Sequence, residues 1–297
     1  MTGPTQEGGP GPEARILYES DDYLAVDKPE GLVSVGAAGG DGLAERLAAG
    51  RTDRLFPVHR LDRGASGVIV FAKNAAAHRH LNGEFDRRDV AKTYLACVDG
   101  APAVSSGRIN APIREFGSGR MGVDAKRGKP STTEWKLAER FDGAALLRVR
   151  PATGRRHQIR VHLYHIGHPI LGDPLYGDRE RQARFPRLML HALEIGFALP
   201  SGERVTVAAP APPSFEAVLA GLRTKKRALA FTDLESSRSG EGIILADPRS
   251  GGGTRGAGGT VRTGSRGAGE PEDIPEPKAE RGSPRDNKRE PKSGVKR

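Results

Sequence analysis

The chain has 297 residues, which is enough for one large domain or two small ones. Hydrophobic residues without glycine are 36% of it, against roughly 45–50% for an average globular protein on a different apolar set that includes glycine, and we expect part of the chain not to fold. The net charge of +10 favours a polyanionic partner such as nucleic acid, and the single cysteine excludes an internal disulfide and suits a reducing cytoplasm.

Residues 1–14 are polar and rich in Gly and Pro, and we expect them to be a flexible leader. They show neither the basic nor the apolar region of a secretory signal, and no apolar run in the sequence approaches the roughly 20 residues that span a bilayer. Folding is expected to begin at Arg15. Two short strands are predicted at residues 16–18 and 23–26, followed by a tight loop at residues 28–32 and a short helix over residues 41–49.

A charged cluster runs directly into a strand in the segment HRLDRGASGVIVFAK, residues 59–73. Asp62 stands between two arginines, so we expect it to be ionised and available as a nucleophile or a charge stabiliser. The apolar residues 68–71 that follow predict a buried strand, with the charged cluster at its mouth. A surface salt bridge in a turn before a strand would explain the four residues HRLD, 59–62, as well.

Asn74 is a candidate cap for a helix over residues 75–87, where apolar residues recur at i, i+4 and i+8. Residues 90–98 predict a strand that carries Tyr94. On local evidence this tyrosine is either half-buried packing in a sheet or a catalytic group.

Residues 108–130 are basic and predicted to be rich in loops, and their glycines spell GxGxxG. The strand before and helix after that a dinucleotide site needs are missing from the pattern, so a loop that grips phosphates is the better interpretation. Beyond it, Asp142 and Gly143 predict a hairpin between residues 132–141 and 144–149, with Trp135 in the core. A helix is expected from Arg155 or Arg156 to Gly167.

The sequence after Leu222 changes in composition, and residues 226–297 are expected to be a mostly disordered, basic, Gly- and Pro-rich tail. From Ser236 onward the sequence has no aromatic residue and more basic than acidic residues. The remaining positive charge lies on residues 1–235, so the basic character is not confined to the tail.

Five segments together, in this order and spacing, resemble the RluA-like pseudouridine synthases, which isomerise uridine to pseudouridine in structured RNA. The segments are HRLDRGASG from residue 59, KTYLA at 92–96, TGRRHQIRVHL at 153–163, GHPILGDPLYG at 167–177 and LMLHALEIGF at 188–197. The resemblance runs from about residue 16 to residue 222. It implies an α+β fold, in which a long, mixed, mainly antiparallel sheet is flanked by helices and loops and crossed by a central catalytic cleft. The catalytic domain would then span residues 15–225.

The resemblance also implies roles for individual residues. Asp62 would attack the sugar or the base, Arg160 would be its cationic partner, and Tyr94 would stack on the uracil or move a proton. Substrate-binding roles fall on Arg60, which would fill the space of an extruded base, and on His59, His157 and Leu190. Two positions differ from the common family pattern: Ala65 stands where threonine is usual, and Arg156 where a small hydroxyl residue is usual.

The reaction gains no electrons or groups, so no metal or other cofactor is expected. The expected partner is ribosomal or transfer RNA, and the expected protein is a cytoplasmic monomer that does not associate with membranes. Two other functions stay open at this point. One is a non-catalytic RNA-binding or ribosome-assembly factor on the same scaffold, and the other is a metal-dependent phosphoesterase using the histidines at 157, 162, 165 and 168.

Overall fold

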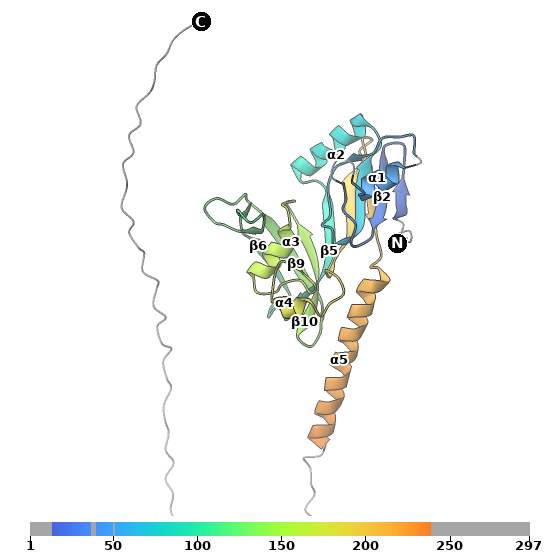
Figure 1. Ribbon diagram of the computed structural model, residues 1–297. Coiled ribbons are helices and arrows are strands. Elements are labelled where there is room, and N and C mark those ends of the chain that lie inside the picture. The colour runs from blue at the N-terminus through green and yellow to red at the C-terminus, as the bar shows by residue number, and fades with distance from the viewer. Residues whose placement is uncertain (1–13, 37–39, 50, 239–297) are drawn as a thin grey trace, which may run out of the picture. The chain divides into compact units, whose positions relative to one another are not determined.

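A single long sheet organises the chain (Figure 1). The computed structural model describes residues 14–36, 40–49 and 51–238. The strands follow one another across the sheet in the order β1 (Arg15–Glu19), β2 (Tyr23–Lys28), β4 (Ser66–Ala72), β11 (Leu190–Ala198), β5 (Ala91–Asp99), β10 (Ala144–Pro151), β9 (Thr132–Arg140) and β6 (Ser106–Asn110). Strand β3 (Phe56–Pro57) pairs with β4, and β12 (Arg204–Ala208) pairs with β11.

The sheet is mainly antiparallel, and its parallel pair, β4 with β11, lies near the middle. Strand β4 is buried over its whole length, as its continuous run of apolar residues predicts for a central strand. Strands β9 and β10 form the predicted hairpin around Asp142 and Gly143. This architecture confirms the α+β fold expected from the sequence.

The helices divide between the two halves of the sheet (Figure 1). Helices α1 (Leu43–Ala48) and α2 (Ala75–Arg87) lie beside the half that contains β2 and β4. Helices α3 (Gln158–His165) and α4 (Arg179–Gln182) lie beside the half that contains β9 and β10. Helix α2 has the predicted bounds, because the Asn74 side chain accepts a hydrogen bond from the Ala77 N–H at 2.8 Å.

Two hydrophobic cores fill the space between these layers. One contains β2, β4, α2 and the far end of β11, and the other contains β5, β9, β10 and α3. Trp135 lies in the second core, as predicted, and is 5% exposed. Tyr94 on β5 packs against both cores, so the middle of the sheet is where they meet.

Three segments differ from the sequence-based expectations. The basic segment 108–130 is rich in turns and loops, as expected, but it also contains the end of β6 and a separate hairpin of β7 (Ile113–Glu115) and β8 (Met121–Val123), which the sequence did not predict. The predicted helix at residue 155 begins at Gln158 instead. Its side-chain oxygen accepts hydrogen bonds from the Thr153 hydroxyl at 2.6 Å and the Arg155 N–H at 3.0 Å, and these bonds hold the preceding residues in a turn.

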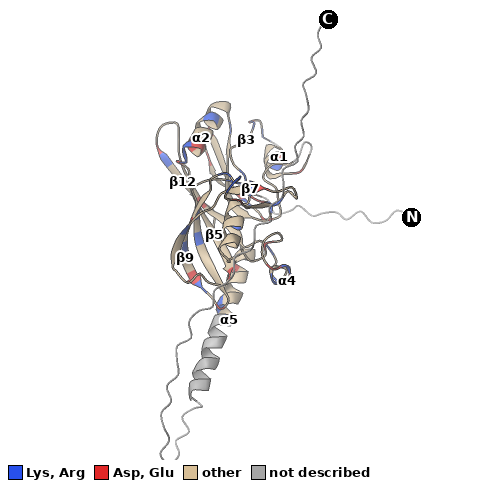
Figure 2. Ribbon diagram, turned by 90° about the vertical axis from the view of Figure 1, so that its left-hand side faces the viewer, with Lys and Arg blue, Asp and Glu red and all other residues tan. Residues whose placement is uncertain are grey.

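The third difference is helix α5 (Pro213–Arg238), which continues across the expected domain boundary at residue 225. The expected leader at 1–14 and the tail beyond residue 238 lie almost entirely outside the described residues. Within the described part, Lys and Arg are spread over several strands and helices (Figure 2). No helix in that part is long and apolar enough to cross a membrane.

Candidate active site

A cavity of about 690 Å³ opens over the middle of the sheet. Its walls come from four places: the loop between β3 and β4, the end of α2 with the start of β5, the segment from the end of β10 through the first turn of α3, and the first residue of β11. All seven residues singled out from the sequence line it: His59, Arg60, Asp62, Tyr94, His157, Arg160 and Leu190. Ala65 and Arg156, the two departures from the family pattern, line it as well.

Hydrogen bonds from the end of β2 and the segment that follows it hold the loop that carries Asp62. The Ser34 hydroxyl donates to the Leu61 carbonyl at 3.0 Å and accepts from the Leu61 N–H at 2.9 Å. The Gly31 N–H donates to the Arg63 carbonyl at 2.8 Å, and the fully buried Lys28 ammonium lies 3.4 Å from the same oxygen. Burial lowers the pKa of Lys28 to about 8, and the charge of Arg187 adds to this effect.

Gly67 allows β4 to approach β11 immediately after that loop. Its φ is +111°, and a Cβ at this position would lie 2.2 Å from the carbonyl oxygen of Ala192. Ala192 is the partner of Gly67 in the parallel pair. A larger residue would push the two strands apart, so this glycine fixes where the Asp62 loop meets the sheet.

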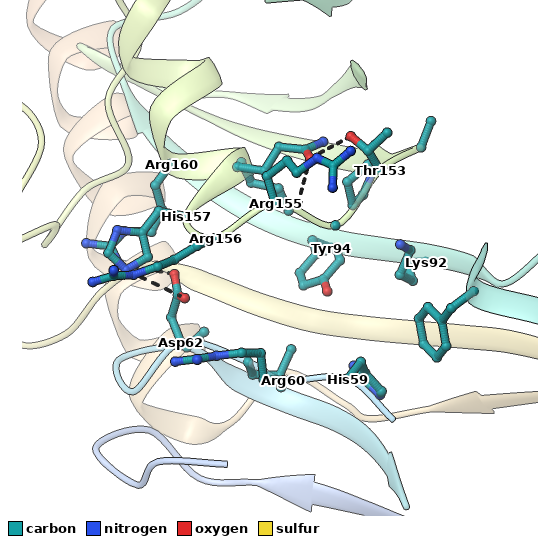
Figure 3. A pocket seen from close by; sticks show the side chains of 18 of the residues that line it. His59, Arg60, Asp62, Lys92, Tyr94, Thr153, Arg155, Arg156, His157 and Arg160 are labelled. Carbon is teal, nitrogen blue, oxygen red and sulfur yellow. Dashed lines mark hydrogen bonds and ion pairs between the residues drawn. The ribbon is translucent and has the colours of Figure 1, made fainter. Parts of the chain in front are cut away.

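Asp62 is paired with Arg160, which comes from α3 (Figure 3). The Nη1 group of Arg160 donates to Asp62 Oδ2 at 3.1 Å. The neighbouring arginines in the sequence, Arg60 and Arg63, are both exposed. The cation that touches Asp62 therefore comes from 98 residues away, as the family resemblance implied and the local sequence did not.

Arg160 is itself fixed by a second carboxylate. Asp173 accepts from Arg160 Nε and Nη2, both at 2.7 Å, and its side chain is fully buried. Burial lowers the pKa of Arg160, but the hydrogen bonds and charge of Asp173 and the charge of Asp62 outweigh it and raise the pKa overall. One guanidinium thus joins two carboxylates, with Asp173 buried and Asp62 facing the cavity.

His157 lies on the other side of the Asp62 carboxylate. It has a left-handed backbone, φ +55°, just before α3 begins, and its Nε2 is 3.9 Å from Asp62 Oδ1. Its Nδ1 is 3.1 Å from the hydroxyl of Tyr176. Burial lowers the pKa of His157 although the charge of Asp62 opposes this shift, so we expect a neutral ring at neutral pH.

Tyr94 lies between the Asp62 cluster and Lys92 in the cavity (Figure 3). It is half-buried, and β5 holds it between Val149 of β10 and Ala192 of β11. Burial raises the pKa of its hydroxyl and the charge of Asp62 raises it further, so the phenol keeps its proton at neutral pH. Leu190 is 4% exposed and contributes an apolar part of the wall.

His59 and Arg60, which lie three and two residues before Asp62, have different surroundings. His59 accepts a hydrogen bond from the Val70 N–H at 3.0 Å, and its ring centroid is 5.3 Å from that of Phe85. Burial, with a contribution from Lys92, lowers the pKa of His59 to about 3. These contacts orient the loop. Arg60 is exposed at the mouth of the cavity (Figure 3).

Sequence reasoning assigned no role to Asp173 or Tyr176, although both lie in the quoted segment GDPLYG. An aspartate between glycine and proline in a loop is ordinarily an exposed turn residue. Nothing in the spacing indicated that its side chain would be buried under a helix lying earlier in the chain.

Three of the four histidines that suggested a metal site have separate partners, His157 among them. His162 is buried between the Thr133 hydroxyl and the Ala111 carbonyl, and His168 contacts the Asp99 carbonyl. Among the described residues, no three His, Cys, Asp or Glu side chains are grouped so that they could hold a metal ion.

Comparisons with known proteins agree with this geometry. Residues 22–165 match the family model for RNA pseudouridylate synthase. The ribosomal large subunit pseudouridine synthase C of Vibrio parahaemolyticus is 40% identical over 220 residues, covering 71% of this chain and 70% of that protein. The protein of the same name from Haemophilus ducreyi is 40% identical over 229 residues, covering 72% of this chain and 71% of that protein.

Solved structures agree with the sequence relatives. Human RNA pseudouridylate synthase domain containing 1 superposes with a TM-score of 0.61 at 33% identity, covering 70% of this chain and 89% of that one. Human RNA pseudouridylate synthase domain containing 4 gives a TM-score of 0.60 at 27% identity, covering 70% and 93%.

The chain belongs to the RNA pseudouridine synthases, and within them to the RluA-like family. It is therefore an enzyme that isomerises uridine to pseudouridine in RNA.

Proposed function

We propose that this enzyme modifies specific uridines of structured RNA with Asp62 as its central catalytic group and without a metal or other cofactor. Ribosomal RNA is the favoured substrate, because the relatives at 40% identity are named for the large ribosomal subunit. Transfer RNA is the second candidate. We further propose that the enzyme is a cytoplasmic monomer, and that residues 15–225 form its catalytic domain.

The observation that carries the proposal is the shared cavity. Asp62, Tyr94 and Arg160 come from a loop, a strand and a helix that are far apart in sequence, yet all three line one space. Its volume of about 690 Å³ falls in the range of pockets that enclose a small ligand, which is enough for an extruded uridine. The open mouth beside Arg60 leaves a path for the RNA backbone.

The chemistry requires a carboxylate beside a flat base. The C–N glycosidic bond breaks, the base turns, and a C–C bond forms at the same sugar carbon. The hydrogen at C5 of the uracil leaves as a proton, and N1, released from the sugar, gains a proton. Asp62 either attacks the sugar or the base or stabilises the positive charge that develops on the sugar. Arg160 orients this carboxylate through a charged hydrogen bond, since Asp173 restrains the guanidinium from its other side.

Tyr94 is suited to two tasks in this reaction. Its ring offers a stacking surface for the uracil, against the apolar wall that includes Leu190. Because burial raises the pKa of its hydroxyl, the group acts as a hydrogen-bond donor, and it becomes a proton acceptor only when the phenol can pass its own proton on.

Reaching a uridine inside folded RNA requires extruding it, at a cost of a few kcal/mol. Arg60 is exposed at the mouth of the catalytic cavity, two residues before Asp62 in the loop. Its planar guanidinium is suited to stacking in the vacated space and to contacting phosphate, which would offset part of that cost.

The test is the variant Asp62→Asn, assayed by release of tritium from RNA labelled at C5 of uracil. We expect RNA binding to be kept and tritium release to be lost, whereas the exposed turn variant Asp142→Asn keeps both. Undiminished release from Asp62→Asn would refute the assignment. Binding without release by the unaltered protein on ribosomal and transfer RNA alike would favour the non-catalytic RNA-binding factor.

A further inference from the structure

A second cavity, of about 510 Å³, lies between the β7–β8 hairpin and α3. Tyr176 separates it from the catalytic cavity, because the same ring lines the second cavity and carries the hydroxyl that contacts His157 beside Asp62. The isomerisation as described above makes no use of this space. Its lining residues are Phe116, Ser118, Arg120, Met121, Gly122, Val123, Val161, Tyr164, His165 and Tyr176.

Aromatic rings and the guanidinium group of Arg120 form one side of this cavity. Tyr164 is 46% exposed, which is high for a large hydrophobic side chain in this structure. The Arg120 guanidinium lies over the Tyr176 ring at 5.0 Å and over the Tyr164 ring at 6.0 Å. The floor is apolar and includes the buried side chains of Met121 and Val161.

The hairpin is built so that this cavity exists before any ligand arrives. A Cβ on Gly122 would lie 2.8 Å from the ring of Phe116, so glycine at this position lets that ring approach the strand without shifting. Arg114 donates to Asp124 at 2.6 Å across the base of the hairpin, and Arg156 donates to Glu115 at 2.8 Å, which ties the hairpin to the turn before α3. One of the glycines that spell GxGxxG, Gly122, thus shapes the aromatic wall.

The charge of the cavity indicates what it can accept. None of its ten lining residues is acidic, while one arginine and one histidine face it. A site with flat apolar and aromatic walls, a cation and no carboxylate matches a nucleobase with its phosphate: the base stacks on rings and the phosphate pairs with the guanidinium. An acidic ligand without a ring would use only the guanidinium, and a purely aliphatic ligand would use only the apolar walls.

We propose that this second cavity binds one unstacked base of the substrate RNA, close to the target uridine, with Arg120 on an adjoining phosphate. The inference rests on the proposed function in that the ligand is part of the same RNA. The run of contacts from Asp62 through His157 and Tyr176 to Tyr164 places the two cavities next to each other. Neighbouring nucleotides of one extruded loop can therefore occupy both.

The test measures binding of an unmodified transcript of large-subunit ribosomal RNA at several salt concentrations, using the full chain. Tyr164→Ala should weaken binding by about 5- to 150-fold, the range for removing one base–aromatic stack, while Tyr164→Phe stays within about twofold. Arg120→Ala should weaken binding and reduce the salt dependence by about one phosphate contact. Arg179→Ala, an exposed arginine on α4 that does not line this cavity, is the matched control.

Ultraviolet crosslinking to the same transcript gives a readout that is independent of activity. We expect a crosslinked peptide containing Phe116 or Tyr164, and we expect it also in the inactive Asp62→Asn variant. If the unaltered protein releases tritium but the cavity variants bind the bare transcript normally and no such peptide appears, the second cavity is not a base site and the proposed function stands. Weakened binding to ribosomal particles alone would indicate a protein occupant and would equally overturn the proposal.

If the unaltered protein releases no tritium while the crosslink appears, the proposed function fails and the base site remains. The two failures are therefore distinguishable.

Discussion

Asp173→Asn tests whether the buried carboxylate positions the catalytic pair. Asp173 accepts four hydrogen bonds: two from Arg160 at 2.7 Å, one from the Leu175 N–H at 2.9 Å and one from the Tyr176 N–H at 3.2 Å. An amide replaces one oxygen by an NH₂ group, so at least one of these donors meets another donor. Removing the charge also leaves the guanidinium of Arg160 with Asp62 as its remaining carboxylate partner.

Breaking a buried ion pair by changing one partner costs about 3–5 kcal/mol, and we expect the lower end because the amide keeps one acceptor. Since domains are stable by roughly 5–15 kcal/mol, the variant should still fold. Urea unfolding measures the free energy of unfolding, and tritium release below the transition measures activity. We expect a loss of about 3 kcal/mol and at least tenfold slower release, as Arg160 is no longer held toward Asp62.

Asp142→Asn is the matched control, because the same change in an exposed turn should alter the free energy of unfolding by no more than about 0.5 kcal/mol. If Asp173→Asn unfolds at the same urea concentration as the unaltered protein and releases tritium at the same rate, then the two hydrogen bonds from Arg160 to Asp173 do not organise the site.

Three further predictions follow from individual contacts. Asn74→Ala removes the cap of α2 and should cost about 1 kcal/mol in urea unfolding; no change would mean the cap bond contributes nothing. Tyr94→Phe should keep RNA affinity within about threefold and slow tritium release by about 10²-fold or more, whereas an unchanged rate would leave Tyr94 only a stacking role. In the folded protein the pKa of Lys28 is lowered by burial to about 8, below the ordinary value of 10.5 that the unfolded chain shows. Between these values the unfolded chain binds one more proton, so the stability of the unaltered protein relative to Lys28→Met should rise with pH, by up to about 1.4 kcal/mol per unit. A difference that is flat from pH 8 to 10 would contradict this.

Elements governed by neighbouring residues were predictable from the sequence. Helix α2 has the predicted bounds because a capping asparagine and apolar residues four apart act within one or two turns. The β9–β10 hairpin forms around its Asp-Gly turn for the same reason. Helix α3, by contrast, begins later than predicted, since a side-chain turn between Thr153 and Gln158 competes with the helix.

The candidate catalytic residues were recognised because several motifs of one family occur together in the sequence, and each motif contains one residue with a known type of chemical role. Asp62, Tyr94 and Arg160 could be named in this way, and all three line one cavity. The identity of the partner of Asp62 was not visible in the adjacent sequence, where two exposed arginines flank it. It depends on how α3 packs over the middle of the sheet.

The sequence by itself determined the central buried strand and the main hairpin, because these follow from local periodicity and turn chemistry. It determined the α+β class and the residue types that the reaction needs through the family resemblance that its motifs carry. Only the tertiary structure decided that Asp173 lies beneath Arg160, that Tyr176 separates two cavities, and that the basic segment 108–130 folds into a hairpin with an aromatic wall. Those features arise where segments distant in sequence pack against each other and exclude water. The free energy of such a contact depends on both segments, so neither segment alone predicts it.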